Sequence, residues 1–389
     1  MKKLFIILAI VIAVAGALLW QRYGGLLRLY PAPVASPTID ISGLRVPDGF
    51  QLSVLRSGLM NARVLQKDTL GNFWVSQPSE GLVTLVEMEN GEAVRAQPVF
   101  AGLRDPHGLA FDPDDQFLLY IGEEHRVSRV RVYSEDELVR LVDLPYGSGH
   151  HTRTIGIGPD DMLYVSVGSS CNVCNESDAR RATIMRSAKD GGGAAVYAKG
   201  LRNAVFFTWR NDGKMFATEM GRDLLGDDIP PDEIDIIAQG ENYGWPICYG
   251  KNIHDTEFDK NTYVRNPCME PFETPSFIDI PAHSAPLGLA FIPANSAWPR
   301  EYWNDLLVAY HGSWNRSVPT GYKIVRYDFD ARGNYTGQVE DFMTGFLQPD
   351  GTVIGRPVDI LVEPDGSAYV SDDYAGAIYK VEYRSGLSF

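Results

Sequence analysis

Positive charge is scarce in this chain of 389 residues. Lysine and arginine number 35 against 50 aspartates and glutamates, which gives a formal net charge of −15 and a pI near 4.9. A net negative surface repels phosphate backbones, so nucleic acid is excluded as a partner. The surplus carboxylates suit cation binding, although a solvated acidic surface is an equally simple explanation.

Cysteine is also scarce. Cys171 and Cys174 form a C-x-x-C motif, and Cys248 and Cys268 lie twenty residues apart. Attachment of a c-type haem is excluded, because Asn175 stands where that motif needs histidine. The different spacing of the two pairs disfavours a zinc site, and the strand-rich context does not fit a thioredoxin-like redox pair. Of three possible disulfide pairings, proximity in sequence favours Cys171–Cys174 and Cys248–Cys268.

Long stretches of helical periodicity are absent. Instead a short apolar strand, a Pro-Asp or Asp-Gly turn and a second strand recur, as in Thr154-Ile-Gly-Ile-Gly-Pro-Asp followed by Met162-Leu-Tyr-Val-Ser-Val. Six such units begin near residues 63, 107, 153, 203, 286 and 357. The first four lie about 40–50 residues apart, the period of a four-stranded blade, and the later intervals carry insertions. The pattern predicts an all-β, six-bladed β-propeller over residues 46–389, with two stacked sandwiches as the alternative.

The N-terminus is a separate segment. Lys2 and Lys3 precede an apolar run over residues 4–20. Residues 1–22 are therefore predicted to be a secretory signal peptide or an uncleaved membrane anchor, with the anchor favoured. Residues 23–45 contain three prolines and little periodicity, which indicates a tether. We expect the rest of the chain on the periplasmic or extracellular side, tethered to the inner membrane.

Two loops before the repeats carry residues that suit catalysis. Gly147-Ser-Gly-His-His-Thr-Arg precedes the third unit, and its histidines suit a general base unless they are merely solvated. Gly200-Leu-Arg-Asn precedes the fourth unit. Its arginine offers a planar fork of donors for an oxyanion or a carboxylate, and its asparagine adds neutral donors. An arginine that only bridges two blades is the alternative.

Two further regions suit ligands of opposite charge. The segment 219–235 contains seven carboxylates together with glycine and proline, which suits a hard cation with oxygen ligands. A metal-free acidic loop is the alternative. The late loops, Ala309-Tyr-His-Gly-Ser-Trp-Asn-Arg with Lys323 and Gly355-Arg-Pro-Val-Asp, combine aromatic and cationic residues. That combination suits a flat, multiply anionic ligand, with exposed loop decoration as the alternative.

Three motifs together carry a family resemblance. Gly-Leu-Arg-Asn at 200–203, Asp-Glu-Ile at 232–234 and Gly-Glu-Asn-Tyr-Gly-Trp-Pro at 240–246 resemble the signature of the glucose/sorbosone dehydrogenase family, over about residues 45–384. The C-x-x-C segment and the His-Gly-Ser-Trp-Asn-Arg loop are similar to its sorbosone dehydrogenase-like branch. The resemblance implies a quinoprotein sugar dehydrogenase, a propeller that uses pyrroloquinoline quinone (PQQ) and Ca²⁺ to oxidise a sugar.

The resemblance also implies roles for individual side chains. His150, a short distance before the Gly-Pro-Asp turn of the third unit, corresponds to the catalytic base, with His151 as its neighbour. Arg202 and Asn203 correspond to the pair above the quinone. Arg356 corresponds to an arginine that holds a PQQ carboxylate at the start of the last unit.

Two metal sites follow from the same resemblance. The Ca²⁺ that binds the cofactor would take the backbone carbonyls of Gly221 and Arg222. A second, structural Ca²⁺ would take the Glu233 side chain and the Tyr243 carbonyl.

The chain departs from the family pattern at several positions. Gly149 replaces the aspartate that precedes the base, and Val358 replaces a second cation two residues beyond the last-blade arginine. The fifth-blade lysine that binds the cofactor has no counterpart in register. We expect Arg316 or Lys323 to substitute for it, and His311 of the same late loops to bind the cofactor.

The implied reaction is a hydride transfer. Ca²⁺ polarises the quinone C5 carbonyl, His150 removes a hydroxyl proton from the sugar as hydride passes to C5, and Arg202 stabilises the oxyanion that forms. A membrane quinone or a cytochrome then takes the electrons. Two other functions also fit the sequence. One is a Ca²⁺-dependent lactonase or esterase, which needs carboxylates converging on the propeller axis, and the other is a non-catalytic extracellular binding propeller.

Overall fold

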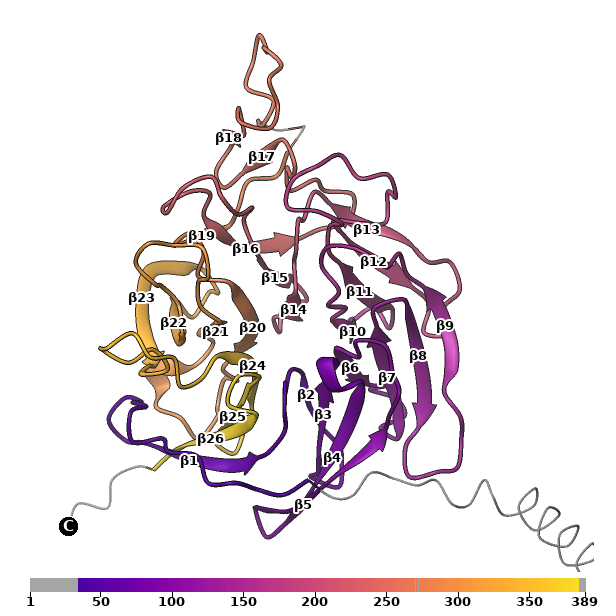
Figure 1. The fold of residues 1–389 in the computed structure, drawn as a ribbon, viewed down its shortest axis with the longest axis vertical. Helices are drawn as coiled ribbons and strands as arrows, with labels where there is room; N and C mark the ends of the chain where they lie inside the picture. Colours follow the sequence, from indigo (N-terminus) through magenta and orange to yellow (C-terminus); the bar gives the residue numbers. More distant parts are fainter. Residues whose placement is uncertain (1–33, 270, 272, 385–389) are drawn as a thin grey trace, which may run out of the picture.

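Six four-stranded antiparallel sheets surround a central axis in the computed structural model, which describes residues 34–384 apart from 270 and 272 (Figure 1). Each sheet is one blade whose first strand lies nearest the axis. The prediction of an all-β, six-bladed propeller is confirmed. The blades also begin close to the positions that the sequence repeats indicate.

The first three blades each use four consecutive strands. Blade one comprises β2 (Leu65–Lys67), β3 (Phe73–Gln77), β4 (Leu82–Glu89) and β5 (Glu92–Phe100), with a 3₁₀ turn at Pro78–Glu80. Blade two comprises β6 (Gly108–Phe111), β7 (Leu118–Glu123), β8 (Arg126–Arg131) and β9 (Val139–Asp143). Blade three comprises β10 (Ile155–Ile157), β11 (Leu163–Val167), β12 (Thr183–Ser187) and β13 (Ala195–Lys199).

The last three blades contain the insertions and the chain closure. Blade four comprises β14 (Phe206–Trp209), β15 (Met215–Glu219), β16 (Asp232–Ile237) and β19 (Ile278–Ile280), with the hairpin β17 (Cys248–Tyr249) and β18 (Ile253–His254) inserted before β19. Blade five comprises β20 (Pro286–Phe291), β21 (Leu306–Tyr310), β22 (Lys323–Phe329) and β23 (Tyr335–Met343), with a 3₁₀ turn at Arg300–Tyr302. Blade six comprises β24 (Pro357–Val362), β25 (Ser367–Asp372), β26 (Ala377–Tyr383) and β1 (Phe50–Ser57).

Aspartate side chains form the tight turns that the repeated Pro-Asp and Asp-Gly signals predict. The Oδ1 atoms of Asp112, Asp160 and Asp365 each accept a hydrogen bond from the amide two residues further on, at 2.9, 3.3 and 2.9 Å. Turns of this kind reverse the chain between the first and second strands of a blade. The sequence repeat therefore reflects one local interaction that recurs around the ring.

Neighbouring blades pack face to face, so their middle strands are buried on both sides. Every residue of β3, β11 and β25 is buried. One apolar cluster joins several blades and includes Trp74, Phe216 and Tyr327. These strands lack the strict alternation of a half-exposed sheet, because a blade inside the ring has no solvent face.

The N-terminal strand β1 closes the ring by pairing antiparallel with β26. The two strands come from opposite ends of the chain and lie side by side in Figure 1, one in indigo and the other in yellow. The sequence repeats do not predict this pairing, because β1 belongs to no repeat of its own. Closure completes blade six with its outermost strand, and the ring leaves only short, protected sheet edges, which is how a propeller avoids edge-to-edge association.

The predicted signal or anchor segment, residues 1–22, lies outside the described residues. Within the described ranges, no helix is long and apolar enough to span a membrane. The described part of the predicted tether contacts the propeller. The Val34 amide donates to the Ala96 carbonyl at 2.9 Å, and Arg45 forms a β-bridge with Thr344.

Both predicted disulfides are present. Cys171–Cys174 closes a short loop after β11. Cys248–Cys268 joins the inserted hairpin to the segment that leads to β19. The pairing favoured by proximity in sequence is therefore confirmed.

Candidate active site

The predicted site residues gather on one rim of the propeller. In each blade the loop before the innermost strand and the loop after the second strand lie at the same end, because these two strands are antiparallel. Loops before the innermost strands carry Arg63, His107, His150, Arg202 and Arg356. Loops after the second strands carry Glu124, Ser169, Gly221, His311 and Asp373. Residues far apart in sequence thus converge on one end of the axis.

His150 is held by the loop after β11. Its amide donates to the Ser169 carbonyl at 2.9 Å, and its ring Nδ1 lies 3.1 Å from the same oxygen and 3.0 Å from Ser169 Oγ. A carbonyl oxygen only accepts, so Nδ1 carries the proton and Nε2 is an unprotonated acceptor. Burial and the positive charge of Arg202 lower the pKa of His150 to about 3. The ring is therefore neutral at physiological pH and has the tautomer of a general base.

Gly168 allows His150 to lie close to Asn203. A Cβ at Gly168 would stand 2.6 Å from the His150 Cβ and 2.7 Å from Asn203 Oδ1, closer than packed atoms allow. The Asn203 amide in turn donates to both carboxylate oxygens of the buried Glu219, at 3.0 and 3.2 Å. The structure therefore brings the predicted base and the predicted Arg-Asn pair together across blades three and four.

Arg202 is only 4% exposed, and all of its guanidinium nitrogens have acceptors. Nε donates to the Asn172 carbonyl and Nη2 to Asn172 Oδ1, both at 2.9 Å. Nη2 also donates to Asp223 Oδ2 at 2.9 Å, and Nη1 donates to the carbonyls of Met220 and Gly221 at 3.2 and 3.0 Å. The guanidinium is therefore fixed in orientation and touches the loop predicted to bind the cofactor's Ca²⁺.

That loop follows β15 and contains Gly221 and Arg222. The Arg222 side chain is turned toward Asp255, to which Nη2 donates at 3.0 Å. The predicted ligands are backbone carbonyls, and the Gly221 oxygen has a second lone pair besides the one that Arg202 engages. A cation at this carbonyl stands near the positive charge of Arg202, and the carboxylate of Asp223 offsets that repulsion. The donor set therefore admits Ca²⁺ without requiring it.

A row of carboxylates, all buried except the exposed Asp279, crosses blade four. Glu219, Glu233 and Asp279 lie directly opposite one another on β15, β16 and β19, and Asp235 follows two residues along β16 on the same face. Like charges placed directly opposite destabilise a sheet. Burial raises the pKa of Glu219, Glu233 and Asp235 well above the usual range, and the neighbouring carboxylates raise it further.

Several oxygens of this cluster have no partner. Both carboxylate oxygens of Asp235 and of Glu273 are buried, and neither side chain accepts a hydrogen bond from the described residues. Glu233 Oε1 accepts from the Gly250 amide at 2.7 Å. A hard divalent cation with oxygen ligands satisfies such atoms, so these residues fit the structural Ca²⁺ predicted at Glu233. Asp235, Glu273 and Asp279 join Glu233 as candidate ligands.

Tyr243, the other predicted ligand of this cation, lies beside the same cluster. Its hydroxyl donates to the Ile236 carbonyl at 2.7 Å. The next residue, Gly244, lies so close to Glu273 that a Cβ there would stand 2.7 Å from Glu273 Oε1 and 2.7 Å from the Cys248 Cβ. The Gly-Trp-Pro motif and the Cys248–Cys268 disulfide therefore brace the candidate cation site.

A cationic group lies at the start of blade six. Arg356 Nη2 donates to the Tyr322 hydroxyl at 3.1 Å, and Arg356 Nη1 lies 3.5 Å from His311 Nδ1. His311 Nε2 lies 2.8 Å from Asp373 Oδ1, whose Oδ2 accepts from Arg63 at 2.8 Å. Among the described residues, no carboxylate forms an ion pair with Arg356. Its charge is therefore available to an anionic ligand, as predicted for a PQQ carboxylate.

Burial and the neighbouring charges shift the pKa values of His311 and Asp373. Burial lowers the pKa of His311, against the opposing effect of Asp373, so the ring is neutral and donates from Nε2. Burial also raises the pKa of Asp373, but His311 and Arg63 hold it below the usual range. Asp373 thus balances Arg63 and leaves Arg356 as the surplus charge.

The structure places Arg316 and Lys323 away from this group. Arg316 pairs with Asp228 at 2.7 Å and donates to the Asp227 carbonyl at 2.7 Å, which fastens the late loop to the acidic loop of blade four. Lys323 pairs with Asp341 on the outermost strand of blade five at 2.6 Å. Both side chains are engaged in structural ion pairs.

Sequence reasoning missed several residues of the rim. Arg63 stands before the first repeat, as Arg202 and Arg356 stand before theirs, so its place in the repeat was the available signal. Asn172 and Asp223 lie in irregular loops, where neither periodicity nor a motif marks a contact to Arg202. The structure alone reveals them.

The family model for TrAA12-like proteins matches residues 44–384. The chain belongs to this family. An uncharacterised protein of Borreliella burgdorferi is 31% identical and covers 88% of this chain and 92% of its own length. A PQQ-dependent pyranose dehydrogenase of Coprinopsis cinerea is 23% identical over 88% of this chain, which spans only 55% of that protein.

Solved structures share the fold of this TrAA12-like protein. The holo PQQ domain of the C. cinerea pyranose dehydrogenase is 21% identical, covers 90% of this chain and 98% of its own, and has a TM-score of 0.73. A calcium structure of a Trichoderma reesei AA12 enzyme is 21% identical, covers 90% of this chain and 99% of its own, and has a TM-score of 0.74. A PQQ-bound aldose sugar dehydrogenase of Streptomyces coelicolor is 20% identical, covers 87% of this chain and 99% of its own, and has a TM-score of 0.63. The resemblance that the motifs indicate is confirmed.

Metal removal should reveal the repulsion among the blade-four carboxylates. We expect CaCl₂ to stabilise the EDTA-treated protein, by about 2.7 kcal/mol at a hundredfold excess over Kd. Asp235→Asn should diminish the gain from Ca²⁺, because it replaces an anionic candidate ligand of the cation by a neutral one. Differential scanning fluorimetry measures both effects. Asp341→Asn on the surface of blade five is the matched control, and an undiminished Ca²⁺ gain in Asp235→Asn would rule out this site.

The neutral state of His150 predicts a pH dependence. The folded pKa of about 3 lies below the unfolded value near 6.5, so the unfolded chain binds the proton first. The stabilisation is complete above pH 6.5 and is lost as the pH falls toward 3. In the metal-free protein without cofactor, the imidazole NMR signal that disappears in His150→Gln should not titrate between pH 8 and 5. A midpoint near 6.5 would contradict the assigned hydrogen bonding.

Proposed function

We propose that this protein oxidises a sugar by hydride transfer to PQQ, with Ca²⁺ as a second cofactor. The observation that carries the proposal is the placement of His150. Its unprotonated Nε2, the adjacent Arg202–Asn203 pair and the unpaired Arg356 stand on one rim of the propeller. A base and cations for a multiply anionic ligand are what such an oxidation needs. Membership of the TrAA12-like family and the likeness to PQQ-bound dehydrogenases support the proposal.

When bound, PQQ supplies a quinone that accepts hydride, and Ca²⁺ supplies Lewis acidity toward it. His150 accepts the proton of the sugar hydroxyl at Nε2, while its Nδ1–H remains bonded to Ser169. Ser169 thereby fixes both the tautomer and the direction of the ring. The proton and the hydride leave the same carbinol group, which becomes a carbonyl.

The rim cations act on negative charge. Arg202 lies beside the predicted base and holds its charge in a fixed direction, so it stabilises an oxyanion that forms there. Arg356 of blade six contacts both His311 and Tyr322 of the neighbouring blade five, and its guanidinium fits a carboxylate of the ligand. Val358 is fully buried and contributes no second cation, and Asp373 balances Arg63, so Arg356 is the surplus positive charge of this group.

The same charges argue against the lactonase alternative. A Ca²⁺-dependent hydrolase needs carboxylates that converge on the axis at the site. Here the unpartnered carboxylates Asp235 and Glu273 cluster on one face of blade four, among the strands and next to the inserted hairpin. The rim itself presents arginines and histidines. This arrangement favours an anionic cofactor over a hydrolytic cation centre.

The proposed location is the periplasmic or extracellular side of the membrane, and the proposed electron acceptor is a membrane quinone or a cytochrome. The two disulfides and the apolar segment at residues 4–20 support export. Cell fractionation tests this, because the full-length protein should sediment with membranes and be cleaved by protease added to spheroplasts. Recovery in the cytosolic fraction would rule the location out.

Reconstitution tests the function. The full-length protein should bind PQQ in the presence of Ca²⁺, seen as quenching of tryptophan fluorescence, and should then reduce a dye with an aldose or a pyranose. His150→Ala should lower kcat by about 10²-fold or more with little change in PQQ affinity. Arg356→Met should instead weaken PQQ binding about tenfold.

His151→Ala is the matched control for the base, since this exposed neighbour pairs with Glu124 instead. Its kcat should stay within about twofold of wild type. Absence of PQQ binding by the wild-type protein would reject the dehydrogenase and leave a binding propeller. Full activity in His150→Ala would reject the assigned base alone.

A further inference from the structure

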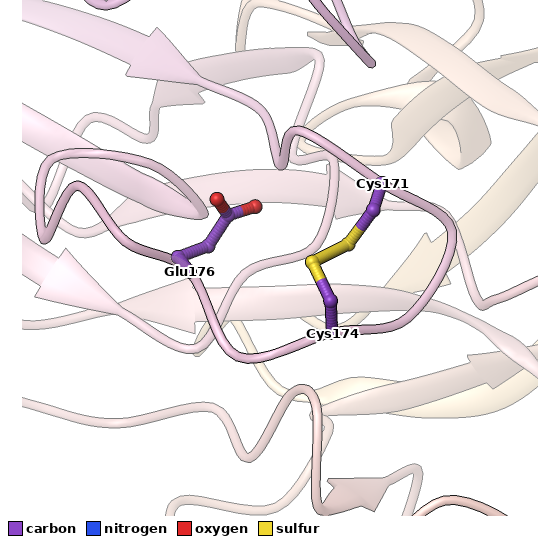
Figure 2. A group of neighbouring side chains, drawn as sticks. All are labelled: Cys171, Cys174 and Glu176. Carbon is purple, nitrogen blue, oxygen red and sulfur yellow. A yellow bond between two sulfur atoms is a disulfide. The ribbon is translucent and has the colours of Figure 1, made fainter.

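The loop closed by the Cys171–Cys174 disulfide contacts three groups of the candidate site. Figure 2 shows the disulfide joining the two ends of a tight turn, with Glu176 just beyond it. Glu176 accepts from the Ser170 amide and hydroxyl at 2.5 and 2.7 Å, which anchors the loop on its entry side. Because the two sulfurs are bonded to each other, they are not free to serve as metal ligands.

Asn172, between the two cysteines, is the residue that reaches Arg202. Its carbonyl and its Oδ1 each accept from the guanidinium at 2.9 Å. The same Oδ1 accepts from the Asp223 amide at 2.8 Å, and Nδ2 donates to the Asp223 carbonyl at 3.0 Å. One side chain thus fixes the arginine and the loop that carries its carboxylate partner.

The entry side of the loop reaches the predicted base. Ser169 Oγ donates to the Cys171 carbonyl at 2.6 Å, which leaves its lone pairs to accept from His150 Nδ1. The Ser169 amide donates to the Arg202 carbonyl at 2.7 Å. The loop therefore bonds to His150 and Arg202 at once and sets their relative position.

We infer that the Cys171–Cys174 disulfide and Asn172 are positioning elements for Arg202 and His150. The catalytic part of the inference rests on the proposed function, whereas the placement of Arg202 does not. The disulfide spans a sequence separation of three, so it removes little entropy from the unfolded chain and adds little to global stability. Its consequence is local: it holds Asn172 where two of the acceptors of Arg202 are needed.

Selective reduction is feasible because the two disulfides differ in exposure. Cys171 and Cys174 are partly exposed, whereas Cys248 and Cys268 are buried, at 6% and 0% exposure. A water-soluble phosphine should therefore transfer two electrons to the first disulfide and yield two titratable thiols. The second disulfide should stay intact under conditions that preserve the fold.

Hydrogen exchange of the cofactor-free protein tests the placement without any activity. In Asn172→Ala the Asp223 amide loses its acceptor, and its exchange should accelerate about tenfold or more. The phosphine-reduced protein and Cys171→Ser/Cys174→Ser should show the same change, also at the Ser169 amide. Asn175→Ala, an exposed asparagine next to the disulfide, is the matched control. Unchanged exchange at Asp223 in all three altered proteins, with melting temperatures intact, would overturn the inference.

Kinetics of the reconstituted enzyme test the catalytic part. Asn172→Ala and Cys171→Ser/Cys174→Ser should each lower kcat about tenfold with KM for the sugar within about threefold, because geometry at the reacting group is lost. Asn172→Asp keeps the acceptors for Arg202 and should recover part of kcat. Combining Asn172→Ala with the cysteine substitutions should cost less than the sum of the two separate losses, since both remove the contacts of Asn172 with Arg202.

Additive losses in the combined variant would overturn the inference, because the disulfide would then act by another route. If the wild-type protein shows no PQQ-dependent turnover, the proposed function fails, and hydrogen exchange at Asp223 still decides whether the disulfide loop positions Arg202.

Discussion

The pairing of β1 with β26 is the constraint on which the candidate site depends. It closes six blades into a ring, so that the innermost strands all begin at one rim and their loops face one another. Arg63 lies in the loop between β1 and β2 and pairs with Asp373, which immediately follows β25 of the blade that β1 completes. Opening the ring at blade six would separate these two residues first. Closure of the fold and assembly of the cationic group are therefore one event.

The distribution of charge runs against the net charge of the chain. The surface carries a large excess of carboxylates, yet the rim presents Arg63, Arg202 and Arg356 in partly or fully buried settings. Buried guanidinium groups need fixed acceptors, and each has them: Asp373 for Arg63, Asn172 and Asp223 for Arg202, and the Tyr322 hydroxyl for Arg356. Arg63 and Arg202 each have a carboxylate among their acceptors, whereas Arg356 does not. The uncompensated positive charge at the rim therefore lies on Arg356 in blade six. An anionic ligand would be oriented with its carboxylate toward that blade.

Repetition and motif account for what the sequence could predict. The Asp-centred turns recur because the chain must reverse direction between the first and second strands of a blade. The number of blades and the starts of the inner strands could therefore be predicted from the sequence. Motifs located His150, Arg202 and Glu233. The sequence could not predict the closing strand β1, the acceptors on Asn172, or the partners of Arg316 and Lys323. Each of these depends on where segments distant in sequence meet once the ring has closed. The sequence suggests Lys323 as a cofactor ligand, whereas in the fold it begins β22 and pairs with Asp341 on the neighbouring strand β23.

The low pKa of His150 sets a condition on the proposed reaction. A base whose pKa is about 3 accepts a proton poorly, and burial with the charge of Arg202 causes that weakness. The family resemblance implies an aspartate before this histidine, whereas this chain has Gly149 there, and the ring hydrogen-bonds the neutral Ser169. An anionic ligand between Arg202 and Arg356 compensates part of the arginine charge and so raises the pKa of the imidazole. On the proposed function, His150 becomes a stronger base when an anionic cofactor is bound, which would tie proton abstraction to the presence of the group that accepts the hydride.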